Sequence, residues 1–87
     1  MITSLTSKEH LSQELASSSV VLLDFYADWC GPCRMIAPIM EELQQDNMKK
    51  GVKILKVNVD EHQDLAEEFG VTTIPIVFFA QNGEIKE

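Results

Sequence analysis

Two cysteines three positions apart are the residues of this chain most able to carry chemistry. They are the only cysteines among its 87 residues, and they stand in the segment Cys30-Gly31-Pro32-Cys33. Two thiols at this spacing can oxidise reversibly to a disulfide. In a reducing compartment such a pair is catalytic or binds a metal more often than it forms a structural framework. The segment therefore points to thiol chemistry.

A structural disulfide and a zinc site are the two alternatives for this pair. Closing a loop with two intervening residues removes little chain entropy, so a structural disulfide here stabilises the fold little. A structural zinc site needs about four ligands, and His10 and His62 lie far from the cysteines without finger-like spacing. We therefore predict that no metal is bound and that both histidines are surface residues.

The flanking sequence predicts that the pair lies between a buried strand and a long helix. Val20–Tyr26 is an almost continuous apolar run, typical of a strand that is covered on both faces. After the cysteines, apolar residues at helical spacing are predicted to face the core: Met35, Ile36, Ile39, Met40 and Leu43. Gly51 is predicted to close this helix.

A position at a helix N-terminus suits a reactive thiol. The unpaired N–H groups and partial positive charge there favour a thiolate, so Cys30 is predicted at an exposed lip and Cys33 one turn inside. Lowering a thiol pKa also weakens the nucleophile, with a Brønsted slope of about 0.4–0.5. An oriented second thiol acts at an effective concentration on the order of 10⁵ M. Intramolecular attack by Cys33 is therefore the larger effect.

The rest of the chain predicts strands that alternate with helices. The expected elements are a short strand over 2–5, a helix from a Thr6 cap with Glu9 to Ala16, a strand over Val52–Asp60, a helix over Gln63–Phe69, a strand over Ile76–Ala80 and a hairpin turn at Asn82-Gly83. This order predicts an α/β fold with a parallel centre, and the hairpin adds an antiparallel edge. The central sheet is therefore expected to be mixed.

Size and charge limit the function further. The 87 residues make one domain, 1–87, and 14 acidic against 7 basic residues give a net charge of −7. Such a balance argues against nucleic acid and anionic membranes as partners. No apolar stretch approaches the roughly 20 residues of a membrane span, and the first residues lack a secretory-signal profile. We expect a cytoplasmic protein.

Asp24 and Pro75 leave alternatives open. Asp24 interrupts the apolar strand, so it either reaches a wet pocket at the strand end or is buried with a raised pKa and transfers protons. The bond before Pro75 is cis in only about 5–6% of comparable cases, so the residues alone favour a trans proline.

The same residues closely resemble the active-site signature of the thioredoxin family. The resemblance rests on Ala27–Cys33 with the flanking segments Asp24–Tyr26, Arg34–Pro38, Lys56–Asp60 and Thr73–Pro75, and it runs to Gly83. It implies a three-layer thioredoxin-like fold with helices on both sides of a mixed sheet. It also implies a protein-disulfide reductase without a bound cofactor.

The resemblance implies a role for each site residue. Cys30 is the attacking nucleophile, Cys33 resolves the mixed disulfide, and Asp24 behind Cys33 takes its proton, supported by a nearby Lys56. The other implied site residues contact the substrate or shape the groove: Trp29, Gly31, Pro32, Ile74 and a cis Pro75. The implied partners are disulfide-containing proteins and a thioredoxin reductase, which draws on NADPH and FAD.

The chain departs from the family's pattern at its C-terminal end. Family members usually continue with a complete last strand and a helix that covers the sheet, whereas this sequence stops at Glu87. We therefore expect a C-terminally shortened fold with an exposed apolar face. The alternatives are a fragment with impaired activity, a self-pairing dimer in a normally monomeric family, and a non-catalytic binding module. An oxidant or isomerase of secreted proteins is disfavoured by the Gly31-Pro32 dipeptide.

Overall fold

The computed structural model describes residues 2–47 and 51–86. The elements follow the chain as β1 (Thr3–Ser4), α1 (Lys8–Ser17), β2 (Val20–Tyr26), α2 (Gly31–Asn47), β3 (Val52–Asn58), α3 (Gln63–Glu68), β4 (Ile76–Gln81) and β5 (Glu84–Lys86). The predicted alternation of strands and helices is confirmed, and the buried strand has the predicted bounds.

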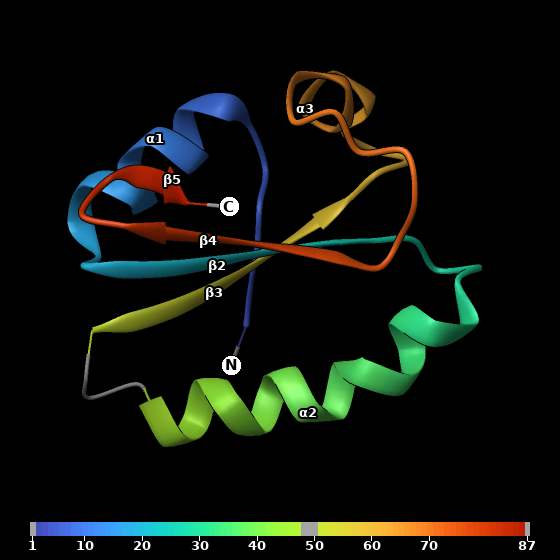
Figure 1. The fold of residues 1–87 in the computed structure, drawn as a ribbon, viewed down its shortest axis with the longest axis horizontal. Helices are drawn as coiled ribbons and strands as arrows, with labels where there is room; N and C mark the ends of the chain where they lie inside the picture. The colour runs from blue at the N-terminus through green and yellow to red at the C-terminus, as the bar shows by residue number, and fades with distance from the viewer. Residues whose placement is uncertain (1, 48–50, 87) are drawn as a thin grey trace.

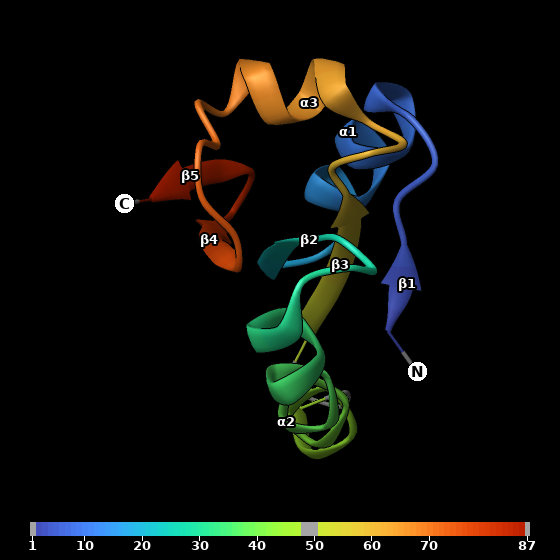
Figure 2. The ribbon, with the colours of Figure 1, turned by 90° about the vertical axis from the view of Figure 1, so that its right-hand side faces the viewer.

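The five strands form one mixed sheet in the order β1-β3-β2-β4-β5. The first three are parallel, and β4 and β5 are antiparallel to their neighbours. Helices α1 and α3 lie on one side of the sheet and α2 on the other (Figures 1 and 2). The predicted three-layer α/β fold with an antiparallel edge is therefore confirmed.

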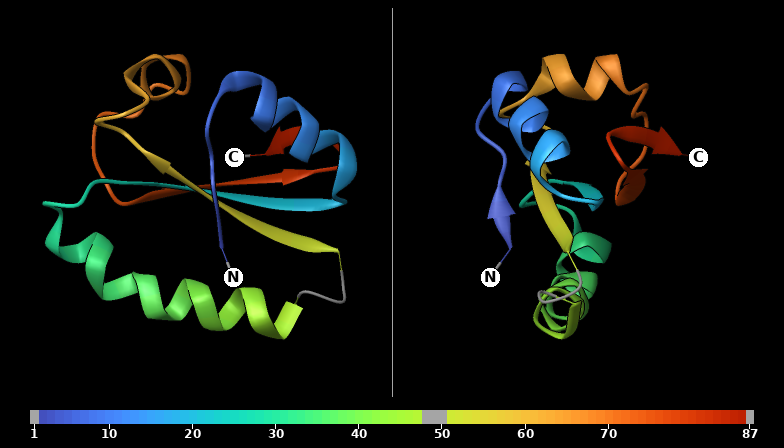
Figure 3. Two further views of the ribbon diagram at one scale, coloured as in Figure 1. Left: turned by 180° about the vertical axis from the view of Figure 1, so that it is seen from behind. Right: turned by 90° about the vertical axis from the view of Figure 1, so that its left-hand side faces the viewer.

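Chain direction explains why the long helix has its own face. From β1 to β2 the chain passes through α1 and crosses the sheet in one direction, and from β2 to β3 it returns through α2. Right-handed crossovers in opposite directions place their helices on opposite faces. The view from behind shows the same separation (Figure 3).

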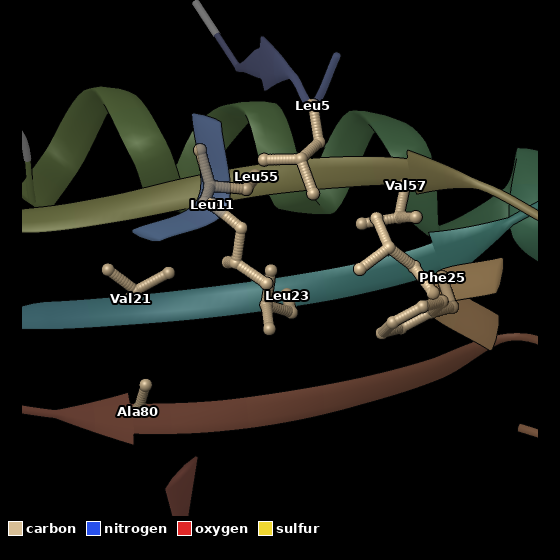
Figure 4. Close-up of a cluster of buried hydrophobic side chains, with 9 residues drawn as sticks. Leu5, Leu11, Val21, Leu23, Phe25, Leu55, Val57 and Ala80 are labelled. Carbon is tan, nitrogen blue, oxygen red and sulfur yellow. The ribbon is translucent and has the colours of Figure 1, made fainter. Parts of the chain in front are cut away.

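The main core lies between the sheet and the pair α1 and α3. Alternate residues of the strands meet there, and Figure 4 shows Val21, Leu23 and Phe25 of β2 beside Leu55 and Val57 of β3. Ring contacts between Phe25, Phe69 and Phe78, with centroids 5.3–5.6 Å apart, close one end of this cluster. By strand alternation, Asp24 and Tyr26 point to the other face, which carries α2.

The prediction that the apolar residues of α2 are core residues is wrong for three of the five. Met40 is buried at 6% exposure, whereas Met35 is 77% exposed, and Ile39 and Leu43 are also exposed. Val77 and Phe79 of β4 are exposed as well. In the described part of the chain α2 is the only helix on this face, and one helix does not cover five strands. Helical spacing shows which residues share a face but not what covers it.

The first helix begins one residue later than predicted. Ser7 is the N-cap, and its hydroxyl accepts the His10 N–H at 3.0 Å. The predicted capping box of Thr6 and Glu9 is replaced by the ring of His10, whose Nδ1 accepts the Thr6 N–H at 3.1 Å. His10 is half-buried rather than a surface residue.

The third strand ends at Asn58 and not at Asp60. The Asn58 side chain accepts the Asp60 N–H at 2.9 Å, and its carbonyl accepts the N–H groups of Glu61 and His62. These bonds turn the chain away from the sheet.

Gln44 of α2 supplies hydrogen bonds that a neighbouring strand would otherwise make. Its amide donates to the Val52 carbonyl at 3.0 Å and accepts the Ile54 N–H at 2.7 Å. Strand β1 pairs only with Leu55 and Lys56, so these β3 groups lie beyond its reach. One buried side chain thus extends the edge of the parallel sheet.

The predicted hairpin is confirmed. Asn82 and Gly83 both have positive φ, 51° and 84°, as a two-residue type I′ turn requires. The turn leads into β5, so a three-residue strand stands where a lack of the last strand was expected. The predicted closure of the long helix at Gly51 falls partly on residues 48–50, outside the described residues.

Candidate active site

The cysteine pair occupies the N-terminus of α2, as predicted. Cys30 precedes the first helical residue, and its Sγ accepts the N–H of Cys33 at 3.2 Å. A sulfur thus takes the place that a serine or aspartate oxygen has in an ordinary N-cap. The two residues are joined by a disulfide, with Cα atoms 5.3 Å apart. The same N–H is therefore placed to stabilise a thiolate on Cys30 after reduction.

The prediction of an exposed lip for Cys30 is wrong. Cys30 and Cys33 are only 4% and 5% exposed. They pack with Ala27 against Tyr26, Val59 and Ile74. These residues come from the end of β2 and the loop after it, the loop after β3 and the segment before β4, which together cover the cysteines.

Trp29 directly precedes Cys30 in the chain and is held by a carboxylate. Its ring is 67% exposed, and its Nε1 donates to Asp60 Oδ2 at 2.9 Å. Asp60 is itself fixed by the Asn58 side chain. Arg34 anchors the same loop through a 2.7 Å bond to the Asp28 carbonyl. The exposed indole therefore has a fixed orientation.

The peptide bond between Ile74 and Pro75 is cis, which confirms the isomer implied by the family resemblance. Ile74 contacts the cysteine cluster. Beside it lies a cavity of about 150 Å³ with an apolar lining: Trp29, Val59, Ala66, Val71, Thr72 and Ile74. Val59 and Ile74 belong both to this lining and to the shell around the cysteines, so the cavity adjoins the cysteine cluster.

Asp24 is buried on the α2 face of the sheet at 2% exposure. Its Oδ1 has no hydrogen-bond partner among the described residues. Burial raises the pKa of Asp24, and the positive charge of Lys56, its partner in the β2–β3 register, partly offsets this rise. The burial expected in the second interpretation is confirmed, and the proton transfer stays a prediction.

Known proteins share this arrangement along the whole chain. A family model described as thioredoxin matches residues 2–87. Thioredoxin from Rickettsia bellii is 41% identical over 87 residues, which cover all of this chain and 82% of that protein. Thioredoxin from Bacillus subtilis is 51% identical over 71 residues, 82% of this chain and 67% of that protein.

The chain belongs to the thioredoxin family.

Its fold also superimposes on solved thioredoxins. Mitochondrial thioredoxin 3 from Saccharomyces cerevisiae, in its oxidised form, matches with a TM-score of 0.90 and 34% identity, over 99% of this chain and 79% of that one. This thioredoxin-family chain is accordingly a thiol–disulfide oxidoreductase, and the redox-active group is the Cys30–Cys33 disulfide. Within residues 2–47 and 51–86, no cluster of three or more potential metal ligands occurs. No helix there is long and apolar enough to cross a membrane.

Three residues at this thioredoxin-like site were missed by the sequence reasoning. Trp29 follows β2 and Asp60 follows β3. Because the carboxyl ends of parallel strands lie at the same edge of a sheet, the proximity of Trp29 and Asp60 was predictable. Val59 lines the cavity from the same turn. The sequence gives no signal for the contact of Tyr26 with Lys56. The two residues meet only because of the register in which β2 and β3 pair, and the sequence does not show that register.

Proposed function

We propose that this chain reduces disulfides in other proteins, with Cys30 as the nucleophile and Cys33 as the resolving thiol. The observation that carries the proposal is the joined cysteine pair at the N-terminus of α2, with the Cys33 N–H directed at Cys30 Sγ. That N–H stabilises the attacking thiolate of the reduced form.

The reaction proceeds by two exchanges. The Cys30 thiolate attacks one sulfur of the substrate disulfide, and the other substrate sulfur leaves as a thiolate that takes a proton from solvent. Cys33 then loses its proton and attacks Cys30 Sγ. The Cys30–Cys33 disulfide forms, the second substrate thiolate is released, and two electrons have passed to the substrate.

Asp24 is the proposed acceptor of the Cys33 proton. Its carboxyl is buried on the face of the sheet that α2 covers, and its raised pKa brings its proton affinity closer to that of a thiol. Lys56 limits this rise in the pKa of Asp24 and so helps to keep the carboxyl ionised, as a proton acceptor must be. The transfer proceeds directly or through water.

The surface around the cysteines suits an extended peptide. The Ile74 backbone beside the cis Pro75 is the proposed pairing edge for the substrate, and the cavity under Trp29 accepts an apolar side chain next to the target disulfide. Gly31 and Pro32, without bulky side chains, leave room for its approach.

The proposed partners are those that membership of the thioredoxin family implies. The oxidised pair needs two electrons per cycle, and we assign them to a flavin-dependent thioredoxin reductase that uses NADPH. The proposed setting is the cytoplasm, where the protein serves electron transport and redox homeostasis.

A trapping experiment tests the mechanism. Because Cys33→Ser removes the resolving thiol, the reduced variant should accumulate a mixed disulfide between Cys30 and a disulfide-containing peptide, detected by intact mass. The matched variant Cys30→Ser keeps one thiol but removes the proposed nucleophile. Absence of the adduct in Cys33→Ser, or an equal amount in Cys30→Ser, would contradict the assignment.

A further inference from the structure

The ammonium group of Lys56 lies over the ring of Tyr26. Lys56 Nζ lies 4.2 Å from the centroid of the Tyr26 ring. In the strand register Lys56 of β3 stands directly opposite Asp24 of β2. Asp24 precedes Tyr26 by two residues on β2, so both side chains lie on the same face of the sheet. Although all three residues are described, no ion pair within 4.0 Å joins Lys56 to Asp24. The ammonium thus rests on an aromatic face and leaves the nearby carboxyl without a close counter-charge.

From this geometry we propose that Tyr26 is a positioning residue for the proton transfer at Asp24. Its ring gives the Lys56 ammonium a resting place when Asp24 is protonated. When Asp24 loses its proton, the ammonium is drawn toward the carboxylate and has to leave the ring. The ring therefore favours the protonated form of Asp24.

Among the groups around Asp24, Lys56 is the charged side chain that shifts the pKa of Asp24. On β4 the residue paired with Asp24 is Val77, which does not titrate. The first turn of α2 carries Cys33, which does not titrate while joined to Cys30, and Arg34, whose guanidinium is bonded to the Asp28 carbonyl. On β2 itself Tyr26 is the neighbouring titratable group, and burial raises its pKa above the ordinary value, so its ring stays neutral. Burial and the charge of Lys56 are the influences that shift the pKa of Asp24.

The proposed hold on the Lys56 ammonium requires the aromatic ring of Tyr26 and not its hydroxyl. The hydroxyl interacts with the Asn58 side chain, whereas Lys56 contacts the ring. Tyr26→Phe keeps the aromatic face and removes only that hydroxyl, so it is the matched control. Tyr26→Leu removes the aromatic face and keeps an apolar side chain in a half-buried position.

The test is a titration of the Asp24 carboxyl carbon by NMR in the oxidised protein. We expect Tyr26→Leu to lower the pKa of Asp24 by about half to one pH unit, equivalent to roughly 0.7–1.4 kcal/mol. Tyr26→Phe should leave it unchanged. In the Lys56→Met background, which has no ammonium to release, Tyr26→Leu should have no effect. An unchanged pKa in Tyr26→Leu, or an equal shift in the Lys56→Met background, would overturn the proposal.

A second substitution keeps the test valid if Tyr26→Leu does not fold. Pentafluorophenylalanine at position 26 has nearly the shape of phenylalanine but a reversed charge distribution on its face. Compared with Tyr26→Phe, it should lower the pKa of Asp24 as Tyr26→Leu does. No difference between the two rings would refute the aromatic hold on Lys56.

The inference rests on the proposed proton transfer from Cys33 to Asp24, and the two are separable. The titration reports the positioning without any turnover. The pH dependence of the resolving exchange, measured as release of a peptide from the Cys30 mixed disulfide, reports the transfer. A shifted titration with an unshifted pH profile would leave the positioning intact and reject the role of Asp24.

Discussion

At the scale of single residues, the most consequential side chain is the buried carboxyl of Asp24. A carboxyl without a hydrogen-bond partner for one oxygen is costly to bury, typically by about 1–3 kcal/mol. Its raised pKa gives this cost a pH dependence. As pH rises, the unfolded chain loses the Asp24 proton first, because its pKa is the lower one. The free energy of unfolding should therefore fall between the unfolded and folded pKa values.

The variant Asp24→Asn tests this reasoning. It should raise the free energy of unfolding by about 1–3 kcal/mol above the folded pKa and remove the fall with pH, because an amide does not ionise. The resolving exchange should slow by about 10²–10⁴-fold, the usual contribution of a proton-transfer group. Urea unfolding across pH and peptide release from the mixed disulfide measure the two effects.

Asp28→Asn is the matched control, because Asp28 is an exposed acid in the turn that follows the same strand. It should change the free energy of unfolding by no more than about 0.5 kcal/mol. An Asp24→Asn variant that is less stable than the parent at high pH would refute the cost of burying the carboxyl.

At the scale of elements, the attachment of α2 to the sheet depends on Gln44. Gln44→Ala should lower the free energy of unfolding by about 2–4 kcal/mol, since it leaves the Val52 carbonyl and the Ile54 N–H without their partners. Gln44→Glu keeps an acceptor for Ile54 and loses the donor to Val52. It should also destabilise the protein, because it places a second carboxylate in a buried position.

Gln45→Ala serves as the comparison for Gln44, since the neighbouring side chain is exposed. Its effect should stay within about 0.5 kcal/mol. Equal losses at the two positions, measured by urea unfolding of the oxidised protein, would mean that the amide contacts with β3 contribute nothing specific.

At the scale of the whole molecule, the balance between the dithiol and disulfide forms follows from two opposing influences. The helix N-terminus and the Cys33 N–H stabilise a thiolate and so favour reduction of the pair. Burial of both cysteines and a net charge of −7 destabilise it. We expect the second group to prevail, because burial acts on both sulfurs and the N–H on one.

The folded protein should therefore have a reduction potential below the glutathione poise of about −220 to −260 mV. Equilibration with dithiothreitol and glutathione buffers, followed by alkylation and mass measurement, gives the value. The reduction potential of the same protein unfolded in urea gives the reference value. The difference between the two potentials is the contribution of folding to the stability of the disulfide, at about 1.4 kcal/mol per 30 mV. A potential above the glutathione poise would assign an oxidising role instead.

Much of this molecule was predictable, and the errors share a cause. Val20–Tyr26 and the turn at Asn82-Gly83 were predicted correctly because strong local patterns specify them. The exposure of Met35 and the burial of Cys30 were not, since both depend on segments distant in the sequence. Gln44 gave no signal, because a glutamine on a helix is ordinarily solvated. The cis Pro75 came only from the family resemblance.

The burial of the two cysteines also bears on the timing of electron flow. A small thiol in bulk solvent has to reach a covered sulfur without the binding energy that a docked peptide gains in the adjoining groove. Exchange with free thiols should therefore be slow beside exchange with bound partners. The fraction of this protein in the oxidised form then depends on how often it exchanges with bound partner proteins. Brief changes in the concentration of small thiols should alter that fraction little.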